Sequence, residues 1–183
     1  MNDGRTFVQL DRRRHDRNAF DCGREPLNRF LREKAAKHAE LGVSRTLVLP
    51  DPNAANDAPA PLVAFFTIAP GSIDRAELPP SRAKRLPHYP VPVFLLGQLG
   101  VASAFHGQGF GSIALGAALG KFAAMHAELH AHAVVVDCLD EPAERFYRHQ
   151  GFQPLDGVVR AADDQVRMFL PMRDVLALFG ASH

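Results

Sequence analysis

The fold is decided by the stretch Leu99-Gly100-Val101-Ala102-Ser103-Ala104-Phe105-His106-Gly107-Gln108-Gly109-Phe110-Gly111-Ser112. An apolar run ends there, a glycine-rich turn follows, and an Ala/Leu-rich pattern of helical spacing begins. Glycines at alternate positions let backbone amides converge on one point, because no Cβ blocks a close approach or a positive φ. The helix adds unpaired N–H groups and the positive end of its dipole. The stretch therefore predicts a phosphate-binding turn between a strand and a helix.

Three kinds of phosphate-binding turn compete for this pattern. A Walker A loop needs a lysine directly after its last glycine, and none follows Gly111. The dinucleotide fingerprint is matched by Gly109, Gly111 and Ala114, with an acid further on at Asp137. That fingerprint lies directly at a strand end, however, whereas here several residues precede Gly109. The third candidate is the acetyl-CoA pyrophosphate loop, [QR]-x-x-G-x-[GA] after a strand reading Leu-x-Val. A glycine turn that only packs a helix on a strand is the alternative without a ligand.

The third pattern is met at the right spacing by residues 106–111 after residues 99–101. This part of the chain resembles motif A of the GNAT superfamily of N-acetyltransferases, and His106 stands where Gln or Arg is usual. The resemblance implies acetyl-CoA as co-substrate and no metal. It also implies that the pantetheine arm lies between two splayed strands, here around residues 99–102 and 134–137. The residues that it places against the cofactor are Leu99, Gly100, Val101, His106, Gly107, Gln108, Gly109, Phe110, Gly111, Ser112 and Phe146.

Further segments resemble one branch of that superfamily, the acetyltransferase toxins of type II toxin–antitoxin modules, which acetylate the amino acid on charged tRNA. The likeness spans about residues 18–171, with Gln98 where Arg is common and Gly100 where Ala is common. Its segments are residues 20–23 and 27–31, 71–73, 86–92, 96–99, 136–137 with 140–141, and 146–148 with 151–152. The resemblance implies a homodimer that is bound by a small ribbon-helix-helix antitoxin.

Tyr147 is the candidate general acid. Ala143, Phe146, Tyr147 and Gln150 share one face of a short predicted helix, which is expected to face the sheet. By residue pattern alone, Tyr147 reads as a core aromatic. The resemblance implies instead that a Phe-Tyr pair at this place supplies the acid for the departing CoA thiolate.

The acceptor implied by the resemblance is the α-amino group of an aminoacyl-tRNA. A free α-amine has a pKa of about 7.7–8.0, so a strong general base is unnecessary and positioning can supply much of the rate. An amide of the strand near Leu99 or Val101 could stabilise the oxyanion.

Basic residues are candidate contacts to the tRNA phosphates, although the net charge of +1 gives no global indication of nucleic-acid binding. They are Arg29, Arg32 and Lys37 on the first helix, and Arg82, Lys84 and Arg85 further along. The alternative to a tRNA contact, for each of these residues, is a place on a solvated face of the protein.

His126 and His130 have the i, i+4 spacing of metal ligands, but no cysteine or acidic cluster accompanies them, so no metal site is expected.

The chain of 183 residues fits one domain, 1–183, with an irregular, basic insertion over residues 70–92 that holds six prolines. The expected strands are Thr6–Leu10, Ser44–Leu49, Leu62–Ile68, Val93–Ala102, Ala133–Val136, Phe152–Gln153 and Val166–Leu170. Helices are expected from Pro26 to before Gly42, over 110–126, after Asp140 and over Asp174–Phe179, with a turn at Asp163-Asp164. This order predicts an α/β (α+β) fold, a single GNAT-like domain whose mixed central sheet of about six to seven strands has helices on both faces.

The two cysteines lack metal-type spacing, and the chain shows neither a signal-peptide pattern nor an apolar run of the roughly 18 residues that a membrane helix needs. A cytoplasmic protein is therefore expected.

The favoured function is acetylation of aminoacyl-tRNA by a translation-inhibiting toxin. The alternatives are a GNAT enzyme that acts on a small-molecule or protein amine, and a non-catalytic CoA-binding module.

Overall fold

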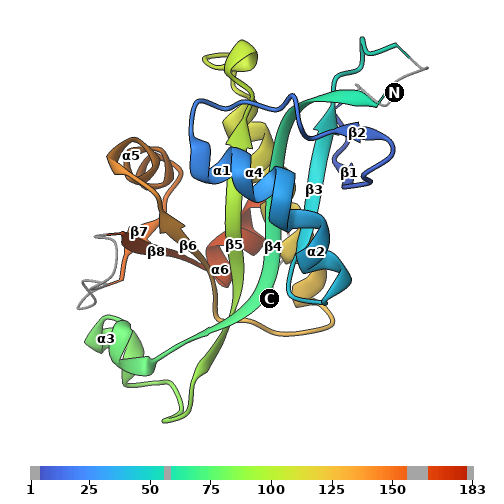
Figure 1. Cartoon of the computed structure of the whole chain (residues 1–183). Helices are drawn as coiled ribbons and strands as arrows, with labels where there is room; N and C mark the ends of the chain where they lie inside the picture. Colours follow the sequence, from blue (N-terminus) through green and yellow to red (C-terminus); the bar gives the residue numbers. More distant parts are fainter. Residues whose placement is uncertain (1–4, 56–58, 156–164, 181–183) are drawn as a thin grey trace. The chain divides into compact units, whose positions relative to one another are not determined.

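The computed structural model describes residues 5–55, 59–155 and 165–180. They form two compact units, the first comprising Met1–Ala69 with Gly97–Ala118 and the second Pro70–Leu96 with Leu119–His183. Two long strands, β4 (Ala60–Ile73) and β5 (Val91–Val101), contribute to both units, as does helix α4 (Phe110–His126) (Figure 1).

The first unit is built on the strand order β1-β3-β4-β5. β1 (Val8–Gln9) pairs antiparallel with β3 (Arg45–Pro50), β3 pairs antiparallel with β4, and the short β2 (His15–Asp16) runs parallel to the start of β4. Residues 62–68 of β4 are buried on both faces, as the continuous apolar run predicts. β5 lies beside β4, since the amide of Ala102 donates to the carbonyl of Val63 over 2.8 Å.

The predicted first helix forms, but its middle is wider than an α-helix. It consists of α1 (Glu25–Arg29), the π-helical segment η1 (Phe30–Lys34) and α2 (Ala35–Glu40). The guanidinium of Arg17 donates a hydrogen bond to the carbonyl of Arg32, inside the π-helical segment. A side chain bonded to a helix carbonyl in this way disturbs the regular ladder. Hydrophobic spacing alone cannot reveal this contact with a residue 15 positions away.

The second unit has the strand order β4-β5-β6-β8-β7. β6 (Ala133–Cys138) runs parallel to β5 and antiparallel to β8 (Val166–Pro171), and β8 pairs antiparallel with β7 (Gln153–Pro154). The sheet is therefore mixed, which confirms the predicted fold class. The predicted turn at Asp163-Asp164 lies outside the described residues.

Residues 70–92 are more regular than the expected insertion. β4 continues to Ile73, a 3-10 turn η2 (Arg75–Glu77) and a short helix α3 (Pro80–Ala83) follow, and β5 begins at Val91. Apolar side chains from this segment bury themselves in one core cluster with residues of β5, β6 and β8, because a strand continuation and a short helix can cover a sheet face that a loop would leave exposed. The cluster comprises Ile73, Leu78, Val91, Val93, Ala133, Val135, Leu155 and Phe169.

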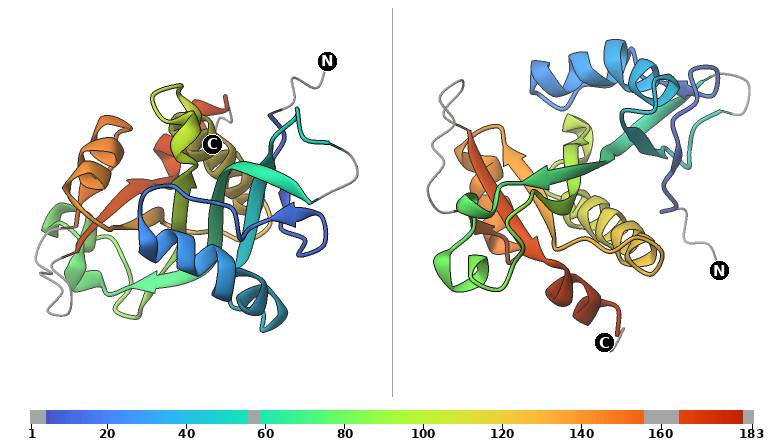
Figure 2. Two further views of the ribbon diagram at one scale, coloured as in Figure 1. Left: turned by 45° about the horizontal axis from the view of Figure 1, so that its top comes forward. Right: turned by 90° about the horizontal axis from the view of Figure 1, so that it is seen from below.

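Helices complete both units. In the second, α5 (Glu141–His149) and α6 (Met172–Leu178) contact β8, and Asp140 caps α5, because its carboxylate accepts the amide of Ala143 over 2.9 Å. In the first, the helical segment of residues 25–40 and the beginning of α4 lie on opposite faces of the sheet (Figure 2). In the described part of the chain, no helix is long and apolar enough to span a membrane.

Candidate active site

The glycine-rich turn is an open cradle of backbone amides. After β5, a 3-10 turn η3 (Ser103–Phe105) leads into the loop, and α4 begins at Phe110. Gly107 and Gly109 have φ angles of 72° and 83°, and a Cβ built on either would have no heavy atom within 4 Å. Within the described residues, the amides of Gly107, Gln108 and Gly109 make no backbone–backbone hydrogen bond of good geometry. The turn therefore offers unpaired N–H groups at the positive end of a 17-residue helix, which is the chemistry that a pyrophosphate requires.

The third glycine of the pattern has another role. Gly111 lies inside α4 rather than in the turn, so it is not one of the positive-φ positions. Side chains around the turn hold it in place. The rings of Phe105 and Phe110 pack edge to face with their centroids 5.6 Å apart, and the side-chain amide of Gln108 donates to the carbonyl of Ala104 over 3.1 Å.

His106, the residue that departs from the usual Gln or Arg, ties the loop to the strand before it. Its Nε2 lies 2.7 Å from the carbonyl oxygen of Val101, the last residue of β5. A carbonyl can only accept, so Nε2 carries the proton in this contact. Gln and Arg also carry side-chain N–H donors, so the contact uses a chemistry that all three residue types share. The sequence shows the departure, but the partner becomes visible only in the folded chain.

The end of β5 reaches beyond its pairing with β6. In the described residues the parallel pairs run from Phe94↔Val134 to Leu96↔Val136, whereas β5 continues to Val101. Backbone groups near Leu99 and Val101 are therefore not used in this pairing. Packing requires a glycine at position 100, because a Cβ there would lie 2.8 Å from Cε1 of the buried Phe65.

Tyr147 is the buried residue of α5, with 8% of its surface exposed. Its ring packs edge to face against Phe146 and Phe152, with centroid distances of 5.1 and 5.3 Å. Phe146, Ala143 and Gln150 are half-buried, which agrees with the predicted inward face of the helix. The amide of Phe152 donates to the carbonyl of Tyr147 over 3.0 Å, so the end of the helix fixes the backbone that carries the phenol.

Asp137 and Cys138 are the last two residues of β6, where the strand is still paired with β8 but no longer with β5. Asp137 binds Arg167 of β8 through both carboxylate oxygens, at 2.8 and 3.0 Å, and this ion pair raises the pKa of Arg167. The pairing gives Asp137 a structural role in place of the ribose contact that a dinucleotide site would need. Burial, reinforced by nearby carboxylates, raises the pKa of the Cys138 thiol to about 12, so the thiol is not a nucleophile at neutral pH.

The predicted basic residues fall in both units. In the first, Arg29 and Lys37 are exposed, whereas Arg32 is half-buried and bonded to Glu25 over 2.6 Å. In the second, Lys84 and Arg85 are exposed and Arg82 lies over the ring of Phe169, with its guanidinium carbon 5.3 Å from the ring centroid.

The rings of His126 and His130 stack with their centroids 4.6 Å apart, and Nδ1 of His126 accepts the amide of Ala131.

Comparisons with known proteins identify the family. The model of the acetyltransferase (GNAT) family matches residues 80–152, a range that includes the glycine-rich turn and Tyr147. The chain is 30% identical over 165 residues to a tRNA-acetylating toxin of Mycobacterium tuberculosis, which covers 90% of this chain and 91% of the relative. The chain therefore belongs to the GNAT acetyltransferase family.

Solved structures agree. AtaT complexed with acetyl-methionyl-tRNAfMet has 27% sequence identity and a TM-score of 0.80, covering 95% of this chain and 98% of that one. AtaTR bound with acetyl-CoA has 28% identity and a TM-score of 0.78, over 95% and 97% of the two chains. These likenesses confirm the predicted fold class and the predicted family.

Proposed function

We propose that this protein acetylates the α-amino group of aminoacyl-tRNA with acetyl-CoA, and that it thereby acts as a translation-inhibiting toxin. The observation that carries the proposal is the similarity along 90% of the chain to a tRNA-acetylating toxin. The open amide cradle at residues 107–109 supplies the physical basis, because unpaired amides at a helix N-terminus suit the pyrophosphate of acetyl-CoA.

In this proposal, residues 99–112 hold the co-substrate. The amides of the turn bind the pyrophosphate, and the backbone of residues 99–101 is available to the pantetheine arm and to the thioester carbonyl. An amide near Leu99 or Val101 donates to the oxygen on which negative charge develops during acyl transfer. His106 contributes by keeping the turn tied to β5, through its bond to Val101. Bound acetyl-CoA supplies the activated acetyl group.

Tyr147 is the proposed general acid. The neutral α-amine attacks the thioester carbon, the N–C bond forms, and the C–S bond breaks. The phenol gives its proton to the CoA thiolate, and the proton lost by the amine nitrogen restores the phenol through solvent. Packing between Phe146 and Phe152 fixes the ring of Tyr147, as an acid that must meet one sulfur atom requires.

The acceptor and the partners complete the proposal. The exposed Arg29 and Lys37 in one unit and Lys84 and Arg85 in the other are proposed contacts to tRNA phosphates. AtaT has been solved bound to the C-terminus of its antitoxin AtaR, and by this similarity we propose an antitoxin partner for the chain. The ribbon-helix-helix domain of that partner, the homodimer and the cytoplasmic location stay predictions from the family resemblance.

Incubation of the protein with labelled acetyl-CoA and total charged tRNA tests the function. We expect label on the aminoacyl group, and Tyr147→Phe should lower turnover by about 10²–10⁴ while acetyl-CoA binding is unchanged. The matched control is Tyr89→Phe, which alters the chain's other tyrosine, an exposed one. Label on polyamines or peptides but not on RNA would overturn the proposed acceptor. Wild-type turnover in Tyr147→Phe would overturn the proposed acid.

A further inference from the structure

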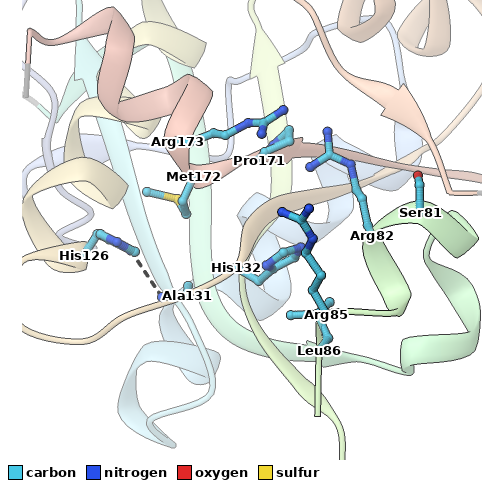
Figure 3. Close-up of a pocket in the computed structure, with 10 residues that line it drawn as sticks. All are labelled: Ser81, Arg82, Arg85, Leu86, His126, Ala131, His132, Pro171, Met172 and Arg173. Atoms are coloured by element: carbon cyan, nitrogen blue, oxygen red, sulfur yellow. Dashed lines mark hydrogen bonds between the residues drawn. The ribbon is translucent and has the colours of Figure 1, made fainter. Parts of the chain in front are cut away.

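A cationic pocket in the second unit has no part in the acetyl-transfer chemistry described above. It has a volume of about 530 Å³, within the range of small-molecule sites. Its wall comes from α3 and the turn after it, the end of α4, the segment before β6, and the start of α6 (Figure 3). The lining residues are Ser81, Arg82, Arg85, Leu86, His126, Ala131, His132, Pro171, Met172 and Arg173.

Three arginines give this pocket its charge. Arg82 is held over the ring of Phe169 by a cation–π contact, so its guanidinium is positioned before any ligand arrives. Arg85 and Arg173 are exposed, and the carboxylate of Asp174 lies 3.3 Å from Nε of Arg173 and balances part of its charge. The pocket is therefore cationic, and guanidinium groups match a phosphate in geometry as well as in charge.

His132 adds a buried ring nitrogen, Nε2, that has no hydrogen-bond partner among the described residues. Its backbone is fixed at both ends, because its amide donates to Pro92 over 2.8 Å and its carbonyl accepts the amide of Met172 over 3.0 Å. A buried ring nitrogen without a partner is costly, and a ligand oxygen in the pocket would satisfy it.

We infer that this pocket binds one nucleotide of the RNA substrate, with its phosphate on Arg82, Arg85 and Arg173 and its apolar surface on Leu86 and Met172. The inference rests on the proposed function, which it deepens by naming a contact site for the tRNA. The mixed lining favours a nucleotide over an acidic peptide, because a carboxylate side chain would use the cations but leave the apolar part of the wall uncovered. His132 and Arg173 lie far along the chain from the basic segment that contains Arg82, so no sequence pattern joins these three residues.

The test measures binding of deacylated tRNA against salt concentration, and the KM for aminoacyl-tRNA, in the full chain. Arg85→Gln and Arg173→Gln should each reduce the slope of log affinity against log salt by about 1. The KM for aminoacyl-tRNA should rise about tenfold, with kcat and the KM for acetyl-CoA unchanged. Both side chains are exposed, so folding should be preserved. The control is Lys121→Gln, which removes one exposed positive charge of the same unit outside the pocket.

The outcomes separate this inference from the proposed function. If Arg85→Gln and Arg173→Gln match the control in salt slope and KM, the nucleotide pocket is overturned. If a peptide of ten glutamates binds the pocket and loses affinity in these variants while tRNA binding is unchanged, the ligand is an acidic peptide, which also overturns it. If the wild-type protein acetylates no aminoacyl-tRNA, the proposed function fails, and the binding of deacylated tRNA still tests the pocket.

Discussion

Removal of the His106 side chain should weaken acetyl-CoA binding about fivefold. The bond from Nε2 to the carbonyl of Val101, 2.7 Å long, lies at the surface, where a hydrogen bond contributes about 1 kcal/mol net. When this tether is absent, the turn spends more time away from the binding geometry, and part of the binding free energy is used to restore it. Since 1.4 kcal/mol corresponds to a factor of ten, a loss of about 1 kcal/mol raises the dissociation constant about fivefold.

The assay is calorimetric titration of His106→Ala with acetyl-CoA, beside the wild type and His106→Gln. Gln also carries a side-chain N–H donor, so His106→Gln should retain most of the wild-type affinity. The kcat should be unchanged in both variants, because His106 acts on the loop and not on the reacting atoms. An unchanged dissociation constant in His106→Ala would refute the tether. Equal weakening in Ala and Gln variants would indicate that the imidazole contacts the ligand itself.

Three further outcomes follow from the packing and the pKa shifts. Gly100→Ala should destabilise the fold by about 1–3 kcal/mol in urea unfolding, because its Cβ would lie 2.8 Å from the buried Phe65 ring, whereas Gly97→Ala, with its nearest contact at 3.9 Å, should change stability far less; equal effects would contradict this. Burial, helped by a nearby arginine, lowers the pKa of His132, so the unfolded state binds the extra proton and stability should fall as the pH drops below about 6.5. When the pH drops from 7.5 to 5.5, the wild type should therefore lose up to about 1 kcal/mol of unfolding free energy that His132→Gln does not lose. If the unfolding free energies of the two proteins change with pH in parallel, this prediction is wrong. The Cys138 thiol should react with a maleimide at pH 8 only after denaturation, since burial raises its pKa to about 12; rapid labelling of the native protein at this residue, detected by mass spectrometry, would disprove it.

The sequence by itself determined most of the long elements and the class of the protein. Continuous apolar runs at residues 62–68 and 133–136 appear as buried strands, and the helix over 110–126 has the predicted bounds. Local chemistry decides these features, because each signal involves only a few neighbouring residues. These signals are the period of the hydrophobic residues, a helix cap such as Asp140, and the glycines of the turn. The order of strands and helices and the motif at residues 99–112 were therefore sufficient for the fold class and the family.

Only the tertiary structure decided what distant residues do to one another. Arg17 donates a hydrogen bond to the carbonyl of Arg32, the buried Phe65 leaves no room for a side chain at Gly100, and Arg167 pairs with Asp137. Each contact joins residues far apart in sequence, where no periodicity or spacing can report a distance.

The same reason applies to the sites. The sequence singled out the glycine-rich turn, but the fold was needed to show that His106 ties it to Val101 and that Gly111 belongs to the helix. The fold also brings His132 and Arg173 to the basic segment after residue 80. Side chains converge in a pocket only after the strands have paired, so sequence patterns indicate which chemistry is available and packing decides which groups share a site.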